Sequence, residues 1–240
     1  MELSFQNEIK EKINKLQLHL NIVVDTKKEI LLNHRNKIDG IELLKQCKNE
    51  YSKVVFFDPQ YRGILDKQHY GNEGISRGQR RCALTQMSEE TIQKFINEID
   101  RVLTKSGYLF LWIDKFHLCE GIHKWIKNTQ LQIVDLIVWD KNKIGMGYRT
   151  RNRCEFLMVL QKTPIKVKGT WNLHNIPNVW VEKVKTAEHP HTKPIELQMK
   201  LIEATTNKDD IVIDPAMGSG SVFTACRMTG RNFLGGDING

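Results

Sequence analysis

Two short stretches of this chain carry residue types that could do chemistry, and each one follows an apolar run. The first is Asp58-Pro59-Gln60-Tyr61, directly after residues 54–57 (V-V-F-F). The Asp58 carboxylate and the Pro59 carbonyl, whose direction the ring fixes, could accept two hydrogen bonds from an amino group. Tyr61 adds an aromatic face on which a planar base could stack. This stretch therefore predicts a site that holds the amino group of a flat ring.

The second stretch, residues 214–221 (D-P-A-M-G-S-G-S), follows an apolar run at 211–213 and precedes a helical pattern. Gly218 and Gly220 lack the Cβ atoms that would keep a ligand away from the backbone. A strand, a glycine turn and a helix place that ligand at the carboxyl end of the strand, where open α/β sheets bind. Asp237, at the end of the next strand pattern, could accept hydrogen bonds from ribose hydroxyls. Glycine pairs are common in turns, but the whole arrangement predicts nucleotide or nucleoside binding.

Strand-like and helical patterns alternate along the chain, which indicates an α/β fold with a mostly parallel sheet covered by helices on both faces. Expected strands are 54–57, 108–113, 133–139, 156–160, 211–213 and 233–237. Expected helices are 5–20, one beginning within 38–44, 88–105, 116–127, one starting at Pro194, and 221–229. We expect residues 1–35 to form a helical extension and residues 36–240 a single catalytic domain.

Net charge, cysteine spacing and the length of apolar runs limit the kinds of molecule that this protein could bind. The net charge of +8 permits a polyanionic partner. The five cysteines are scattered without a C-x-x-C pair, which argues against a zinc ribbon or a disulfide framework, and we expect no metal site. No apolar run approaches the roughly 20 residues that span a bilayer, and the start is not a signal peptide. We therefore expect a cytoplasmic protein without a membrane partner.

Three motifs in the last quarter of the chain resemble those of the permuted (β-class) DNA amino-methyltransferases. The family patterns H-P-T-x-K-P, D-P-F-x-G-S-G-T and G-x-D/E are similar to residues 189–194, 214–221 and 235–237. The resemblance implies a Rossmann-like methyltransferase fold and S-adenosylmethionine as cofactor. It implies that residues 192 and 193 lie near the methionine end, that residues 218–221 form the floor and that Asp237 holds the ribose. The cofactor-binding residues expected on this basis are Asp39, Thr192, Lys193, Asp214, Ala216, Gly218, Ser219, Gly220, Ser221 and Asp237.

Residues 58–61 resemble the acceptor motif D-P-P-Y of the same family, with Gln60 in place of the second proline. On its own, D-P-x-Y is more typical of a proline turn with a capping Asp, but the apolar run and the cofactor half favour the functional interpretation. The resemblance implies Asp58, Pro59 and Tyr61 as catalytic residues. Because this motif precedes the cofactor motif, the resemblance also implies a circularly permuted motif order. Similar segments extend the match from residue 38 to the end of the chain.

The resemblance implies methyl transfer to a flipped base in double-stranded DNA. Asp at the first motif position and Tyr at the fourth favour the N6 of adenine. A cytosine-N4 enzyme and a catalytically degenerate relative that binds DNA or cofactor remain as alternatives. Recognition is expected from loops at about 62–87 and 161–188, and a homodimer and a cognate restriction endonuclease are candidate partners. Basic residues that could bind phosphates, or could be ordinary surface charge, are Arg62, Arg77, Arg80, Arg81, Arg149 and Arg151.

Overall fold

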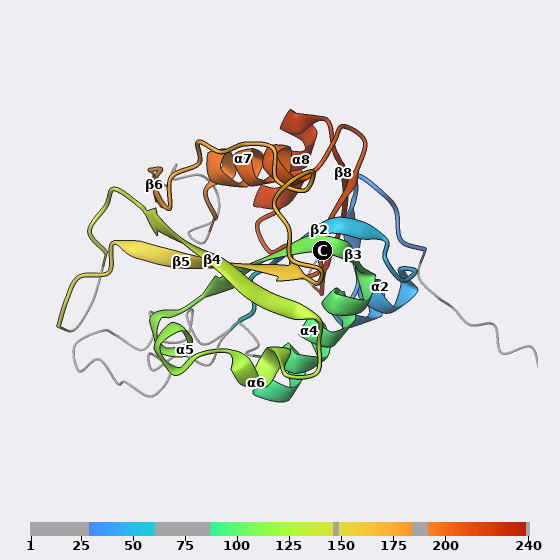
Figure 1. The fold of residues 1–240 in the computed structure, drawn as a ribbon, viewed down its shortest axis with the longest axis horizontal. Coiled ribbons are helices and arrows are strands. Elements are labelled where there is room, and N and C mark those ends of the chain that lie inside the picture. Colours follow the sequence, from blue (N-terminus) through green and yellow to red (C-terminus); the bar gives the residue numbers. More distant parts are fainter. Residues whose placement is uncertain (1–28, 61–86, 146–148, 184–191, 239–240) are drawn as a thin grey trace, which may run out of the picture.

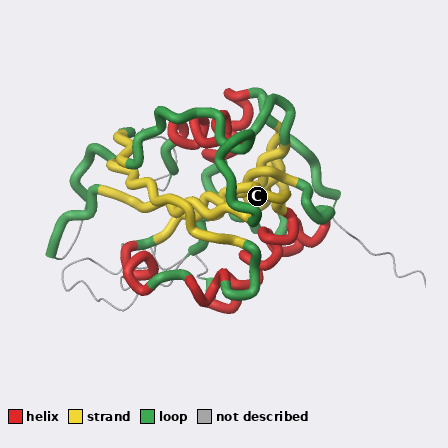
Figure 2. Tube along the Cα trace, viewed as in Figure 1, coloured by secondary structure: helices red, strands yellow, loops and turns green. Residues whose placement is uncertain are grey.

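The computed structural model describes residues 29–60, 87–145, 149–183 and 192–238. Its strands are β1 (Arg35–Lys37), β2 (Ser52–Phe57), β3 (Leu103–Ile113), β4 (Leu131–Asp140), β5 (Cys154–Lys162), β6 (Val179–Val181), β7 (Ile211–Asp214) and β8 (Asn232–Asp237). Its helices are α2 (Gly40–Gln46), α4 (Glu89–Val102), α5 (Lys115–Glu120), α6 (His123–Ile126), α7 (Ile195–Thr205) and α8 (Ser221–Thr229). Figures 1 and 2 show these elements in one view. The predicted helix at 5–20 and the predicted loop at 62–87 lie outside the described residues, except for Met87.

Within the described residues, the strands form one sheet in the order β1-β8-β7-β2-β3-β5-β4-β6. Neighbours from β1 to β3 are parallel, and β6 is parallel to β4. Only β5 runs antiparallel to its neighbours, β3 and β4. The connection from β4 to β5 is short, and its described residues 141–145 and 149–153 form no helix; this allows the reversal, because parallel neighbours need a longer crossover. The prediction of a mostly parallel α/β sheet is confirmed.

Helices cover the two faces of the sheet separately. In Figure 1, α2, α4 and α6 lie on one side of the sheet, and α7 and α8 lie on the other. The central strand β2 is apolar on both sides: Val55 and Phe57 join the core under α4, while Val54 and Phe56 join the core under α7. A strand buried on both faces reads as a continuous apolar run, which is why residues 54–57 show no alternation.

The structure differs from the predicted elements in four places. Residues 35–37 form β1, which pairs with β8, where no strand was predicted and where the helical extension was expected to reach residue 35. The helix predicted at 116–127 is two short helices, because Gly121 adopts a φ of 83° at the end of α5. Helix α4 ends at Val102 rather than at residue 105, and Ser106 lies within β3 with a φ of 60°. The short strand β6 lies within the segment 161–188 that lacked any strand pattern.

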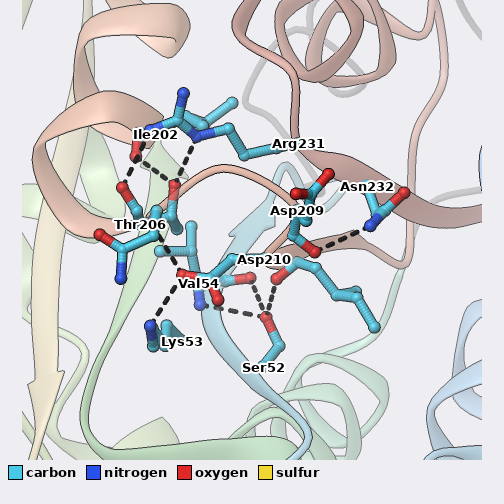
Figure 3. Close-up of polar contacts among 11 residues, drawn as sticks. Ser52, Lys53, Val54, Ile202, Thr206, Asp209, Asp210, Arg231 and Asn232 are labelled. Carbon is cyan, nitrogen blue, oxygen red and sulfur yellow. Dashed lines mark hydrogen bonds and ion pairs between the residues drawn. The ribbon is translucent and has the colours of Figure 1, made fainter.

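Polar contacts fix the amino ends of β2 and β7 against each other (Figure 3). The Ser52 hydroxyl donates to the Ile211 carbonyl at 2.7 Å, and Lys53 pairs with Asp210 at 2.7 Å. Arg231, just before β8, donates from Nη2 to the Thr206 carbonyl at 2.9 Å. These contacts set the register of the two strands at the end opposite to their carboxyl tips. No helix of the described residues is long and apolar enough to cross a membrane.

Candidate active site

Strands β2 and β7 are parallel neighbours, with Val54 beside Val212 and Val55 beside Ile213. Their carboxyl ends therefore lie at the same edge of the sheet. Asp58 follows the end of β2, and Asp214 is the last residue of β7. Both line one cavity of about 440 Å³. The two motifs, which are more than 150 positions apart in the sequence, thus meet at one site.

The cavity brings together most of the residues predicted for the cofactor. Those that line it are Asp39, Lys193, Asp214, Ala216, Gly218, Ser219, Ser221 and Asp237. Three predicted residues do not line the cavity, although each is adjacent in sequence to a residue that does: Pro59, which is buried, Thr192 and Gly220. Tyr61 and the predicted DNA-binding residues Arg62, Arg77, Arg80 and Arg81 lie outside the described residues. Arg149 and Arg151 are exposed in the connection from β4 to β5 and do not line the cavity.

The turn after β7 needs its glycines. Gly218 has a φ of +45° and Gly220 a φ of +76°, in the left-handed region that side chains with a Cβ rarely adopt. The turn is closed by the Gly220 amide, which donates to the Met217 carbonyl at 2.8 Å. From outside, Arg35 of β1 donates to the Gly218 carbonyl at 2.7 Å. Arg35 is a supporting residue that the sequence did not reveal, because its strand has only three residues.

Helix α2 packs closely on the same turn. A Cβ added to Gly40 would lie 2.0 Å from the Pro215 carbonyl oxygen, so only glycine allows this approach. Asp39 caps the helix by accepting from the amides of Ile41 at 2.9 Å and Glu42 at 3.2 Å. The cap therefore explains how Asp39 comes to lie at the cavity wall.

Lys193 is the central charge of the site. Its Nζ lies 3.0 Å from Asp58 Oδ2 and 2.9 Å from Glu155 Oε2. It also lies 4.8 Å from the centroid of the Trp112 ring, which adds a cation–π contact. Burial alone would lower the pKa of Lys193, but the Asp58 and Glu155 carboxylates outweigh burial and raise it. Lys193 therefore stays charged and holds Asp58.

Glu155, on β5, joins this ion pair to a second one. Burial would raise its pKa, but the ammonium groups of Lys193 and Lys141 outweigh burial and lower it to about 2. Glu155 Oε1 pairs with Lys141, whose Nζ lies 5.3 Å from the centroid of the Trp139 ring. Neither Glu155 nor Trp112 was predicted as a site residue.

Asp214 is a buried carboxyl among other carboxylates. Burial and the nearby charges of Asp58 and Asp237 raise its pKa to about 8, against the lowering effect of the Ala216 amide. That amide donates to Asp214 Oδ1 at 3.2 Å. A positive charge in the cavity would favour the ionised form of Asp214, because it would offset the repulsion from the other two carboxylates.

The residues of the cavity fit a nucleoside that carries a charged amino-acid group. Its volume lies in the range of ~300–1,000 Å³ that small-molecule sites show. The glycine turn lets backbone approach the ligand, and Asp237 offers acceptors for hydroxyls at the end of β8. A buried acceptor on α7, Gln198 Oε1, has no hydrogen-bond partner among the described residues.

A sheet in which β2, the strand before Asp58, precedes β7, the strand before the glycine turn, defines a Rossmann-like methyltransferase fold in permuted order. Two solved structures share this fold. The complex of M1.HpyAVI with SAM has a TM-score of 0.60 at 22% identity and covers 85% of this chain and 92% of that one. The PvuII DNA methyltransferase (cytosine-N4-specific) has a TM-score of 0.62 at 15% identity, covering 84% and 80%.

Sequence comparison identifies the family. Residues 53–240 match the N6/N4 methyltransferase model described as DNA methylase. The type II methyltransferase M.HhaII of Haemophilus parahaemolyticus is 57% identical over 208 residues, which cover 86% of this chain and 91% of that protein. M1.MboII of Moraxella bovis is 42% identical over 259 residues, covering 87% and 92%. This chain belongs to the N6/N4 DNA methylase family, and its methyl donor is S-adenosylmethionine.

Proposed function

We propose that this protein transfers a methyl group to the exocyclic N6 of adenine in double-stranded DNA, with the adenine flipped out of the helix. The observation that carries the proposal is the position of Asp58, which lines the same cavity as the glycine turn and is held by Lys193. An amino group that contacts Asp58 would lie next to the cofactor cavity.

The amino group of adenine is a poor nucleophile because its lone pair is delocalised into the ring. We assign to the Asp58 carboxylate and the Pro59 carbonyl the two N–H hydrogen bonds that draw this nitrogen toward a tetrahedral form. When bound, S-adenosylmethionine supplies an electrophilic methyl group on a sulfonium. Tyr61 is assigned to stack on the flipped base. Positioning of the two groups is then the main contribution of the protein to the rate.

Lys193 and Glu155 are assigned a positioning role in this reaction. Lys193 holds one carboxylate oxygen of Asp58, and Glu155 holds Lys193 from the opposite side. Because each partner is charged, the hydrogen bonds between them are of the strong, charge-assisted kind. Asp58 is thereby fixed in direction before the base arrives. Gln60, which replaces a proline of the family motif, leaves these contacts in place.

Cytosine-N4 methylation is the second candidate, because the cytosine-N4-specific PvuII enzyme shares the fold. The acceptor motif has Asp58 at its first position and Tyr61 at its fourth, and these residue types favour adenine over cytosine as the methylated base. The test is incubation of the protein and S-adenosylmethionine with DNA of mixed sequence, followed by digestion to nucleosides and mass spectrometry. We expect N6-methyladenine, and none with Asp58→Ala. N4-methylcytosine would replace our proposal by the second candidate, and cofactor binding without any methylated base would indicate an inactive binder.

We infer the partners from the names of the relatives and from the surface charge. M.HhaII and M1.MboII are type II methyltransferases, which supports a place in a restriction–modification pair with a cognate endonuclease in the cytoplasm. Exposed Arg149 and Arg151 are assigned to DNA phosphates. Arg62, Arg77, Arg80 and Arg81 remain candidates for the same role. A homodimer is proposed on the expectation that recognition is shared between two chains.

A further inference from the structure

Arg35 is an exposed residue of β1 whose guanidinium group contacts the glycine turn after β7. Its Nη2 donates to the Gly218 carbonyl at 2.7 Å. The guanidinium also lies against Gly220, since a Cβ added there would be 3.5 Å from Arg35 Cζ. Gly218 lines the cavity, but Arg35 does not. Arg35 therefore holds the turn from outside the cavity.

The backbone on both sides of Arg35 is fixed to β8. Strand β1 pairs in parallel with β8, with Arg35 beside Gly235. Asn36 is buried and donates from Nδ2 to the Gly235 carbonyl at 2.9 Å. Asn33 accepts at Oδ1 from the Phe233 amide at 2.8 Å. Because these bonds flank Arg35, its guanidinium reaches the turn from a fixed direction.

The bond from Arg35 fixes the orientation of one peptide group. The peptide between Gly218 and Ser219 is trans, because the cis bond found among the described residues is Thr163–Pro164. In a planar trans peptide the C=O and the following N–H point in opposite directions. Arg35 holds the Gly218 carbonyl from outside, so the Ser219 N–H is directed to the opposite side, toward the cavity that Ser219 lines. No acceptor within the described residues takes up this N–H, which leaves it for a ligand.

The local backbone favours the same orientation. The Gly220 amide donates to the Met217 carbonyl at 2.8 Å, so Gly218 and Ser219 are the two middle residues of a β-turn. Gly218 has a φ of +45° and Ser219 does not have a positive φ, which is the pattern of a type II′ turn. If the middle peptide flipped, Ser219 would need a positive φ, which residues with a Cβ disfavour. Arg35 and the serine side chain thus oppose the same flip.

We propose that Arg35 is a positioning residue for the cofactor. It holds the middle peptide of the glycine turn so that the Ser219 N–H donates to an acceptor of S-adenosylmethionine. The inference rests on the cofactor of the family and is independent of which base is methylated.

The first test is calorimetric binding of S-adenosylmethionine. Arg35→Met removes the guanidinium, and Arg35→Lys retains a charged donor. Asn33→Gly is the control, because it removes side-chain bonds to β8 and tolerates the φ of 60° at this position. We expect Arg35→Met to raise Kd about tenfold, Arg35→Lys to raise it less, and Asn33→Gly to raise it less than about twofold. At saturating cofactor the single-turnover rate of Arg35→Met should stay within about twofold of the unchanged protein, because Arg35 does not line the cavity.

A second test separates control of the peptide from general support of the fold. Glycine at position 219 accepts a positive φ, so in Ser219→Gly the guanidinium alone opposes the flip. Arg35→Met should therefore cost about threefold more affinity, or a larger factor, in Ser219→Gly than in the unchanged protein. Effects that multiply independently would overturn the inference.

Amide signals in NMR spectra report the orientation without any reaction. Ser219 and Ser221 are the serines that follow a glycine, so isotope labels on glycine carbonyl carbon and serine nitrogen select their amides. We expect the Ser219 signal to shift when S-adenosylmethionine binds. Without ligand it should move or broaden in Arg35→Met and stay in place in Asn33→Gly. A Ser219 signal that ignores the cofactor, or an unchanged Kd in Arg35→Met, would overturn the inference. A cytosine product would reject the proposed function and leave these binding results untouched.

Discussion

The ammonium group of Lys193 lies between two carboxylates, 3.0 Å from Asp58 and 2.9 Å from Glu155. The three residues come from different parts of the fold: Asp58 follows β2, Glu155 is on β5 and Lys193 precedes α7. This bridge connects the acceptor motif to the cofactor cavity. It predicts that Glu155, which does not line the cavity, controls the reaction through Lys193 and Asp58.

Glu155→Gln should slow methyl transfer while leaving cofactor affinity nearly unchanged. The substitution removes one of the two carboxylates that hold Lys193, so Lys193 and Asp58 lose their fixed direction. Small misplacements of reacting groups can cost about 100-fold in rate, and we expect a loss of about 10- to 100-fold. Single-turnover rates and calorimetric binding of S-adenosylmethionine measure the two effects separately. Glu203→Gln, which alters an exposed pair with Lys200, is the control. A proportional loss of affinity and rate would contradict the positioning role.

Gly220→Ala should weaken cofactor binding in addition to straining the backbone. Gly220 has a φ of +76° beside the cavity, and Gly169 has a φ of +79° on a surface turn with nothing near its Cβ position. Alanine in this conformation costs about 1–2 kcal/mol at either position, so both variants should lose similar stability in urea unfolding. Only Gly220→Ala should also weaken S-adenosylmethionine. Equal affinities in the two variants would contradict a role of this turn in binding.

The stability of the protein without cofactor should fall as the pH rises because of Asp214. Its pKa is raised to about 8 in the folded protein, from 3.8 for an ordinary Asp. Between these values the folded carboxyl keeps its proton while the unfolded one has lost it, so rising pH favours unfolding. Below pH 4 and above pH 8 the effect is constant. The difference in unfolding free energy between the unchanged protein and Asp214→Asn should therefore shrink by up to about 1.4 kcal/mol per pH unit in this window.

Urea unfolding at pH 5, 6 and 7 measures this difference. Other titrating groups occur in both proteins, so their contributions cancel in the comparison. A difference that stays constant over these pH values would show that Asp214 is ionised throughout.

Replacing Arg149 and Arg151 by alanine should reduce the salt dependence of DNA binding. Each phosphate contact contributes a slope of about −0.9 in a plot of log affinity against log salt concentration, so the slope should become shallower by up to about 2. Lys168→Ala with Lys208→Ala removes the same charge from exposed positions outside the cavity lining and is the control. If both double variants gave the same slope, the change would be due to the lower net charge and not to phosphate contacts of Arg149 and Arg151.

Much of this site could be predicted from the sequence because its elements are local. The apolar run before Asp58 and the glycine turn after β7 each carry their own signal, and the alternation of patterns implies that their ends share one edge of the sheet. The partnership of Lys193 with Glu155 could not be predicted, because it depends on β5 lying antiparallel beside β3. A local sequence pattern predicts a strand but not which strands are its neighbours in the sheet.

The central claim is that Asp58, held by Lys193, receives the amino group that is methylated. The most direct measurement is the single-turnover rate of methyl transfer to DNA by Asp58→Asn, with the modified nucleoside identified in the unchanged protein. We predict a loss of about 10²–10³-fold in rate with cofactor affinity nearly intact, because Asn retains the shape but not the charge, and N6-methyladenine as product. A rate within a few fold of the unchanged protein would contradict the claim.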